Sequence, residues 1–138
     1  MYINVMIEEN AKMPTKAHEN DAGFDLYSRE TTVIDPRSSK CFDTGVHIQI
    51  PAGMTGFLKS KSGLNCRHSI TSEGVIDSGY TGSIVVKLYN HSDCPYLVEA
   101  GNKISQIVFI PIPQVSLQEK SNLEDTDRGN NGFGSSGK

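Results

Sequence analysis

Short runs of β-branched and aromatic residues, separated by turn signals at close intervals, constrain the fold of this 138-residue chain most strongly. Residues of these kinds favour strands. Turn-forming pairs such as Asp35-Pro36 and Ser78-Gly79 separate the runs. Many short strands at this spacing predict an all-β sandwich or barrel. The expected strands lie at 2–7, 31–34, 45–50, 83–89 and 103–112.

Helical signals are scarce, and the best short candidate is 62–69, with Ser62 near its start. A chain of this length predicts one domain with a core. From Leu117 onward the composition turns to Gly, Ser, Asn and Asp, which bury little surface. We therefore expect a barrel domain over 1–119 and a flexible C-terminal segment over 120–138.

Charge and cysteine content narrow the functional classes. A net charge of -3 argues against direct nucleic-acid binding, which usually requires a basic surface. Three widely spaced cysteines without a C-x-x-C pair fit a reducing compartment. The sequence shows neither a signal-peptide pattern nor a stretch of membrane-helix length. We expect no membrane association and a cytoplasmic protein, or one inside an infected host cell if the source is a virus or phage.

The C-terminal stretch RGNNGFGSSGK fits both G-x-G-x-x-G and G-x-x-x-x-G-K. Both phosphate-binding motifs require a strand before them and a helix after them, and neither is predicted here. The remaining chemistry is that of flexible glycines with Arg128, Ser135 and Ser136 as phosphate donors and Phe133 as a ring that can stack on a base. Two interpretations stay open, a disordered tail and a lid that orders over a nucleotide.

The stretch EGVIDSGYTGS (73–83) predicts a hairpin that presents Asp77 and Tyr80 at its bend. Asp77 is either a general base beside a ring that contacts a sugar, or a residue that only forms a turn. Lys59, Lys61 and Ser62 form either an anion site or a solvated basic turn. Gln106 interrupts an apolar strand, which indicates either a hydrogen-bond partner for its amide or a surface-facing strand edge.

Five segments taken together resemble the ordered motifs of the trimeric dUTPases: AGFDLYS, KSGL, GVIDSGYTG, GNKISQ and RGNNGFGSSG, which span 22–137. The resemblance implies a distorted jelly-roll β-barrel and a homotrimer whose active sites are shared between chains. It also implies hydrolysis of dUTP to dUMP and pyrophosphate, with Mg2+ on the triphosphate. Such an enzyme limits uracil incorporation into DNA and supplies dUMP for thymidylate synthesis.

The same resemblance implies roles for single residues. Asp77 would deprotonate the water that attacks the α-phosphorus, and Tyr80 would exclude a 2′-hydroxyl. Asp25 would act near the metal through water or phosphates. The implied substrate-binding residues are Lys61, Ser62, Gly63, Gly74, Tyr80, Val85, Gln106, Arg128, Phe133, Gly134, Ser135 and Ser136.

The chain departs from the family pattern at Lys61 and Lys103, where arginine is usual, and at Asn131, where glycine is common. Lysine keeps the charge but lacks the planar guanidinium fork, so we expect less rigid phosphate positioning at Lys61. Two alternatives remain open. One is a dCTP deaminase-like enzyme on the same fold, and the other is a binding module in which nucleotide controls contact with a regulatory protein of unknown identity.

Overall fold

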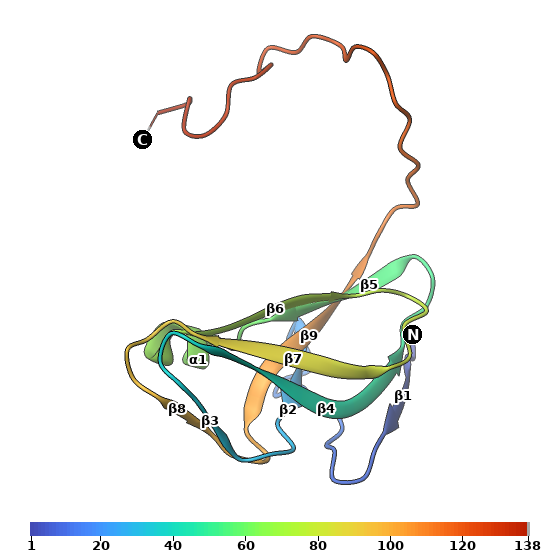
Figure 1. The fold of residues 1–138 in the computed structure, drawn as a ribbon. Coiled ribbons are helices and arrows are strands. Elements are labelled where there is room, and N and C mark those ends of the chain that lie inside the picture. Colours follow the sequence, from blue (N-terminus) through green and yellow to red (C-terminus); the bar gives the residue numbers. More distant parts are fainter. Residues whose placement is uncertain (138) are drawn as a thin grey trace.

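A computed structural model describes residues 1–137 as a curled antiparallel sheet with one short helix (Figure 1). Seven strands follow the order β1-β4-β7-β6-β5-β9-β2, and β3 pairs with β8 separately. The predicted all-β jelly-roll architecture is confirmed. The elements are β1 (Asn4–Ile7), β2 (Gly23–Tyr27), β3 (Thr32–Ile34), β4 (Ser39–Gln49), β5 (Met54–Lys59), α1 (Ser62–His68), β6 (Ile70–Ile76), β7 (Ser83–Asn90), β8 (Tyr96–Val98) and β9 (Lys103–Pro111).

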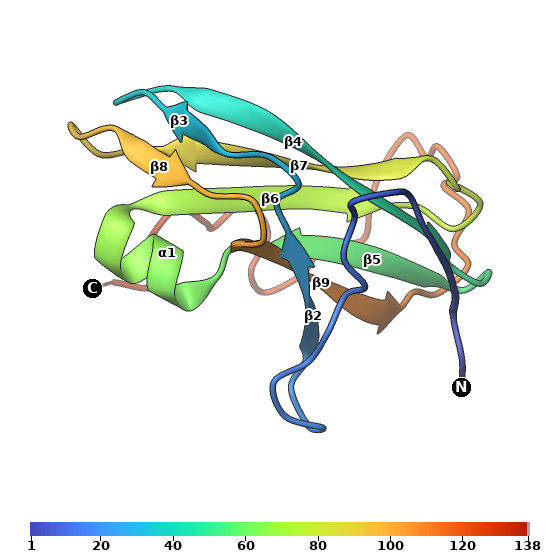
Figure 2. The same cartoon turned by 90° about the horizontal axis from the view of Figure 1, so that it is seen from below.

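The sheet curls because β6 changes its partner along its length. Its first half, Ile70–Ser72, pairs with Leu88–Asn90 of β7. Its second half pairs instead with β5, from Glu73 opposite Lys59 to Ile76 opposite Gly56. In the view from below, β7, β6, β5 and β9 lie side by side in this order (Figure 2).

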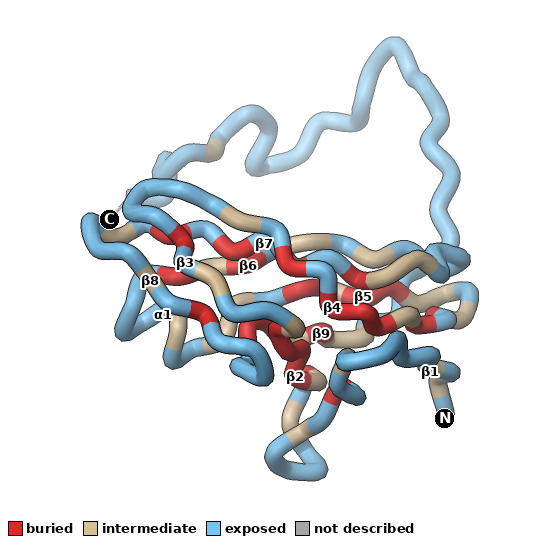
Figure 3. Tube along the Cα trace, turned by 60° about the horizontal axis from the view of Figure 1, so that its bottom comes forward, coloured by how far each residue is buried: buried red, intermediate tan, exposed pale blue. Residues whose placement is uncertain are grey.

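Side chains alternate along β7 between the inside of the curl and solvent, as expected for a strand with one buried face. The inward residues Ile84, Val86 and Leu88 are completely or almost completely buried. The buried positions gather inside the curled sheet, where β2, β4, β5, β7 and β9 enclose one core (Figure 3). Burial of this apolar face holds the sheet together.

The long strand β4 contains a bulge opposite the start of β7. Asp43 pairs with Val85 and His47 with Ser83, so three residues of β4 oppose one residue of β7 between these pairs. Gly45, inside the bulge, has a φ of 64°, and a Cβ there would collide with the Arg29 guanidinium. The bulge therefore depends on a glycine.

Each of the five predicted strands is present, although β4 begins at Ser39 rather than at residue 45. Four further strands, β2, β5, β6 and β8, were not among the expected runs, although 75–76 was predicted to enter a hairpin. The short helix begins at Ser62 as predicted and ends at His68, because Ser69 takes a left-handed conformation with φ of 56°.

Regular structure ends at Pro111, and residues 112–137 contain no helix or strand. This segment extends away from the sheet in Figure 1, and all of it except Gly132 is exposed. Lys138, the last residue of the expected flexible segment 120–138, lies outside the described residues. None of the helices described within 1–137 has the length and apolar character needed to span a bilayer.

Asn90 is the buried polar residue that joins β7 to the loops beside β3 and β8. Its amide donates to the carbonyls of Ile34, Asp35 and Cys94 at 3.1, 3.2 and 2.8 Å. We expect Asn90→Ala to lower the free energy of unfolding by about 2–4 kcal/mol, because it removes these bonds and leaves carbonyls unpaired. Urea unfolding at fixed chain concentration measures the change.

Asn4→Ala is the matched control, because the exposed Asn4 amide makes one side-chain bond, to Gln49. We expect this variant to stay within about 0.5 kcal/mol of the parent protein. Equal losses in the two variants would contradict a special role for the buried asparagine.

Candidate active site

Three segments far apart in the sequence meet at a pocket of about 270 Å³. The loop before β2 and β2 itself supply one wall, which includes Asp25. Lys61 and Ser62 come from the start of α1, and Lys103 and Gln106 come from β9. The structure thus brings together the predicted residues of the first, second and fourth motifs. Ala17, Asp21, Ala22 and Gly23 complete the lining.

Asp25 organises this pocket as a buried carboxylate between two ammonium groups. It is 4% exposed and forms ion pairs with Lys61 and, at 2.7 Å, with Lys103. Burial acts to raise the pKa of Asp25, but the hydrogen bonds from Lys103 and Lys61 outweigh it and hold this pKa below its usual value. The same contact raises the pKa of Lys103. The trio carries one net positive charge, which suits an anion.

Gln106 has the partner that its apolar surroundings required, since its amide donates to the Ser60 carbonyl at 3.1 Å. It lies opposite Asp25 on β2 and Lys59 on β5. A Cβ on Gly23 would collide with the Gln106 side chain. Gly23 therefore makes room for Gln106 at the pocket wall.

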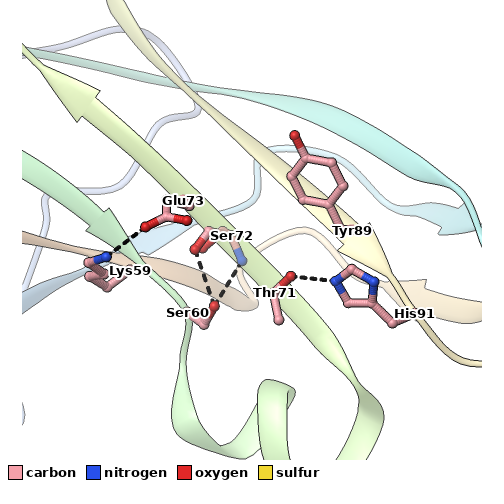
Figure 4. A pocket seen from close by; sticks show the side chains of 7 residues that line it. All are labelled: Lys59, Ser60, Thr71, Ser72, Glu73, Tyr89 and His91. Atoms are coloured by element: carbon pink, nitrogen blue, oxygen red, sulfur yellow. Dashed lines mark hydrogen bonds and ion pairs between the residues drawn. The ribbon is translucent and has the colours of Figure 1, made fainter. Parts of the chain in front are cut away.

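Ser60 lies just before α1, and two hydrogen bonds to β6 hold it in place. Its hydroxyl donates to the Ser72 carbonyl at 3.1 Å and accepts from the Ser72 amide at 2.9 Å. Ser60 and Ser72 line a wider hollow of about 630 Å³ over β5, β6 and β7 (Figure 4). Lys59 pairs with Glu73 and Thr71 bonds His91 in this hollow. Lys59, one of the candidate anion-site residues, thus lies in this hollow and apart from Lys61 and Ser62, and we assign the hollow a supporting role for the start of α1.

The third motif forms a separate site where β6 and β7 part. Within residues 1–137 the ladder between these strands covers Ile70–Ser72 and stops there. Gly74 is paired on its β5 side, and Val85 on its β4 side. Their facing edges have no strand partner in the part of the chain described, so they present backbone donors and acceptors without a ladder partner; we call this open stretch between the two strands the slot.

Asp77 and Tyr80 lie at the end of this slot, as the hairpin prediction requires. Asp77 is exposed and follows the last residue of β6. The Tyr80 amide donates to the Asp77 carbonyl at 3.2 Å, and its hydroxyl donates to the Ser83 carbonyl at 3.0 Å. Gly79 has a φ of 87°, which closes the turn. The tyrosine ring is held by its own loop.

The slot and the anion pocket lie far apart within one chain. The two ends of β6 separate Asp77 from α1, and seven extended residues span roughly 20 Å. In Figure 1 the β6–β7 turn and α1 lie at opposite ends of the sheet. A reacting phosphate cannot contact both Asp77 and Ser62 of the same chain.

The predicted tail residues lie at neither site. Phe133 is fully exposed, with φ of 51°, and the Arg128 guanidinium donates to the Asn131 carbonyl at 3.1 Å. Gly134, Ser135 and Ser136 form turns at the end of the described chain. Their roles as nucleotide contacts stay predictions.

The oxygen ligands that Mg2+ prefers are few among the same residues. Both carboxylate oxygens of Asp25 face lysines, and no group of three or more His, Cys, Asp or Glu residues forms a metal cage within 1–137. Mg2+ retains several waters and binds phosphates readily, so it does not need such a cage. The donors present fit an ion carried on a triphosphate better than an ion held by Asp25.

Sequence reasoning missed some residues of the site. Lys103 is predicted only as a departure from the family pattern, and Gly23 appears only within the motif AGFDLYS. A glycine at a strand position is a signal for close approach of a neighbouring group. His47 falls within the predicted strand 45–50 without a predicted role, yet it contacts the loop that carries Tyr80.

A sequence model described as dUTPase matches residues 9–137 of this chain. The chain belongs to the dUTPase family. The deoxyuridine 5'-triphosphate nucleotidohydrolase of Clostridium kluyveri is 44% identical over 134 residues, which cover 95% of this chain and 94% of the relative. The enzyme of the same name from Clostridium tetani is 40% identical over 136 residues, covering 96% and 94% of the two chains.

Solved dUTPase structures share the fold. The Staphylococcus bacteriophage 80alpha dUTPase with dUPNHPP has a TM-score of 0.92 at 31% identity, covering 99% of this chain and 98% of the phage chain. A mutant of the phage phi11 dUTPase of S. aureus, described with a structural Mg(II) ion, has a TM-score of 0.83 at 27% identity, covering 91% and 100% of the chains. These similarities do not favour the deaminase or the nucleotide-controlled binding module that the sequence left open.

Removing the Asp25 charge tests the electrostatic centre of this dUTPase pocket. We expect Asp25→Asn to lower the free energy of unfolding at pH 7 by about 1–3 kcal/mol, because two lysines lose their partner in a buried site. A carboxylate with a depressed folded pKa stabilises the protein above its unfolded pKa, near 3.8, and this contribution is lost as the pH falls through the folded value. The difference between variant and parent should therefore narrow below about pH 4.

Urea unfolding at pH 7, 5 and 3 measures this difference. Asp35→Asn, at an exposed position, serves as the control. A gap between Asp25→Asn and the parent that stays constant down to pH 3 would show that the depressed pKa is not the source of the stabilisation.

Proposed function

We propose that this protein hydrolyses dUTP to dUMP and pyrophosphate by attack of water on the α-phosphorus. Membership of the dUTPase family supports this reaction. The observation that carries it for this chain is the pairing of a backbone-lined slot ending at Asp77 with a cationic pocket holding Ser62 and Gln106. The slot suits a planar base, and the cationic pocket suits a chain of phosphates.

The slot is the proposed site for uracil. Free backbone groups at Gly74 and Val85 are suited to the alternating acceptors and donors on the uracil edge. Cytosine reverses this pattern and would leave buried groups unpaired, which costs binding energy. Tyr80, held by its bond to the Ser83 carbonyl, would lie against the deoxyribose and leave no room for a 2′-hydroxyl.

Asp77 is the proposed general base. Its carboxylate is exposed at the end of the slot, where a water molecule can reach it. The base would accept a proton from the water as the water attacks phosphorus, and in-line alignment supplies much of the rate. No covalent intermediate is required, because phosphoryl transfer depends mainly on positioning and charge stabilisation.

The anion pocket is the proposed phosphate site. Ser62 and the Gln106 amide would donate to phosphate oxygens, and the backbone at Gly63 lies beside Ser62 at the start of α1. Lys61 would supply charge when the phosphates draw it from Asp25, and Lys103 keeps Asp25 paired. Magnesium bound to the triphosphate would neutralise charge and fix its geometry, with Asp25 acting only at a distance.

We further propose a homotrimer in which neighbouring chains combine the slot of one with the pocket of another. The distance between Asp77 and Ser62 in one chain supports this arrangement. The tail would complete the site from a third chain, with Arg128, Gly134, Ser135 and Ser136 at the γ-phosphate and Phe133 over the base. An exposed tail of 26 described residues after Pro111 has ample reach, since extended chain covers roughly 3.3 Å per residue. Closure of this tail over the nucleotide would exclude water.

Replacement of the base separates binding from chemistry. We expect Asp77→Asn to bind a non-hydrolysable dUTP analogue normally while kcat falls by about 1,000-fold or more, because the amide cannot accept the proton. Pyrophosphate release from dUTP, dCTP, dTTP and UTP measures activity and specificity, and ammonia release is monitored alongside. The exposed Asp35→Asn variant is the control. Near-normal turnover would eliminate Asp77 as the base, and ammonia from dCTP would point to a deaminase.

Mixed oligomers test whether sites are shared. We expect the Asp77→Asn chain and a chain lacking 128–138 each to be inactive alone. Refolded together, they should regain part of the activity, since some sites then combine an intact Asp77 with an intact tail. Native mass spectrometry verifies mixing. Absence of recovery in verified mixed trimers would indicate that each site is built from one chain.

A further inference from the structure

The loop that carries Tyr80 is attached to β4 by a histidine outside the five family motifs. His47 Nδ1 lies 2.7 Å from the carbonyl oxygen of Thr81, the residue after Tyr80. His47 Nε2 lies 2.8 Å from Glu8 Oε1. The His47 side chain is 18% exposed, so it is largely enclosed between these partners.

Both partners of His47 accept hydrogen bonds and cannot donate them. A carbonyl has no proton to give, and an ionised carboxylate has none either. A neutral imidazole carries one N–H and can satisfy only one of these acceptors, whereas imidazolium satisfies both. The geometry therefore selects the charged form of His47.

The charges around His47 favour the same form. Glu8, after β1, is the nearest, and Asp43 lies on the same strand. The hydrogen bond with Glu8, followed by that with the Thr81 carbonyl, raises the pKa of His47 above its ordinary value of 6.5. The hydrogen bond from His47, followed by that from Arg29, lowers the pKa of Glu8. Arg29 also faces this group, 2.8 Å from Glu8 and 3.9 Å from Asp43.

A second contact from β4 holds the residue where β7 begins. The Ser83 hydroxyl donates to Asp43 Oδ1, and the same carboxylate oxygen accepts the Gly45 amide at 3.0 Å. The Glu8 amide donates to the Gly45 carbonyl at 2.9 Å, which fixes Glu8 over the β4 bulge. Two acidic side chains and one imidazolium therefore connect the bulge to 81–83.

We propose that His47 is a positioning residue for the reaction, which sets the loop carrying Asp77 and Tyr80 by bridging the Thr81 carbonyl to Glu8. This inference rests on the proposed dUTP hydrolysis for its kinetic readout only. Within the loop 77–82, one backbone bond, from Tyr80 to Asp77, is described, so the external contact to Thr81 restricts its movement. Small displacement of a reacting group is enough to slow an oriented reaction.

Two substitutions test the bridge through their pH profiles. We expect His47→Gln, which offers one donor and no charge, to lower kcat/KM for dUTP about tenfold at pH 7 and to remove the alkaline decline due to His47. Glu8→Gln keeps an acceptor for Nε2 but removes the charge that favours imidazolium. It should therefore move this alkaline decline to lower pH while the rate near pH 6 stays close to that of the parent. If His47 had a purely structural role, Glu8→Gln would leave the pH of this alkaline decline unchanged.

Hydrogen exchange provides a readout that needs no turnover. Near pH 7, amides of 77–83 should exchange faster in His47→Gln than in the parent, while those of 84–90 are unchanged. As the pH rises through the raised pKa of His47, the two proteins should become alike, because the parent then loses the same proton. If dUTP is not hydrolysed at all, the proposed function fails, yet this comparison still tests the bridge.

His91→Gln is the matched control, since His91 bonds Thr71 at the opposite end of β7 and faces no part of the loop. It should leave both the pH profile and the exchange of 77–83 unchanged. Profiles of His47→Gln and Glu8→Gln that overlie the parent, together with equal exchange at pH 7, would overturn the proposal.

Discussion

The change of partner along β6 is the constraint on which the rest of this structure depends. Because β6 leaves β7 after Ser72 and joins β5, the sheet curls and encloses its core. The same departure leaves the backbone edges of Gly74 and Val85 without a strand partner in the described chain. Unpaired backbone groups are costly when buried, so such edges persist where water or a ligand can meet them. The curl of the sheet and the proposed recognition surface therefore arise from one feature.

The cationic pocket depends on a second long-range constraint. Asp25, Lys61 and Lys103 come from three segments that meet only when β2, β9 and the start of α1 lie together. An isolated buried carboxylate would be destabilising, and two lysines without it would repel each other. Their combination yields a stable site with one excess positive charge. The lysines at these positions, rather than the more usual arginines, form single-point contacts with Asp25 instead of a planar fork.

Local patterning was sufficient for part of the fold. The β-branched and aromatic runs 83–89 and 103–112 predicted β7 and β9, and the many short runs between turn signals predicted an all-β class. The strand β5 was missed because Gly56 and Lys59 break its apolar pattern. Gly56 is required there by close packing, since a Cβ would meet Ile107 at 2.7 Å. Strand propensity counts Gly56 as unfavourable, but it does not include the neighbouring Ile107 side chain that requires a glycine there.

The candidate site was predictable from the sequence to a similar degree as the fold. The sequence predicted a hairpin presenting Asp77 and Tyr80, which is present. The bridge at His47 does not follow from local sequence, because it arises only where the β4 bulge brings Glu8 beside the imidazole.

The separation of slot and pocket gives a physical reason for assembly in the proposed enzyme. A short strand such as β6 cannot place its two ends at one phosphorus atom, so the proposed reaction would require a second chain. A site shared between chains would bring the slot of one chain to the pocket of another without a larger domain. It would require both the slot and the pocket to be held in place before the chains assemble. Asp25 with its two lysines supplies that order at the pocket. At the slot, the loop 77–82 has few bonds of its own, and its position is set by β4 through His47 and Asp43. In the proposed trimer, residues remote from the reacting atoms would therefore determine whether two chains form one site.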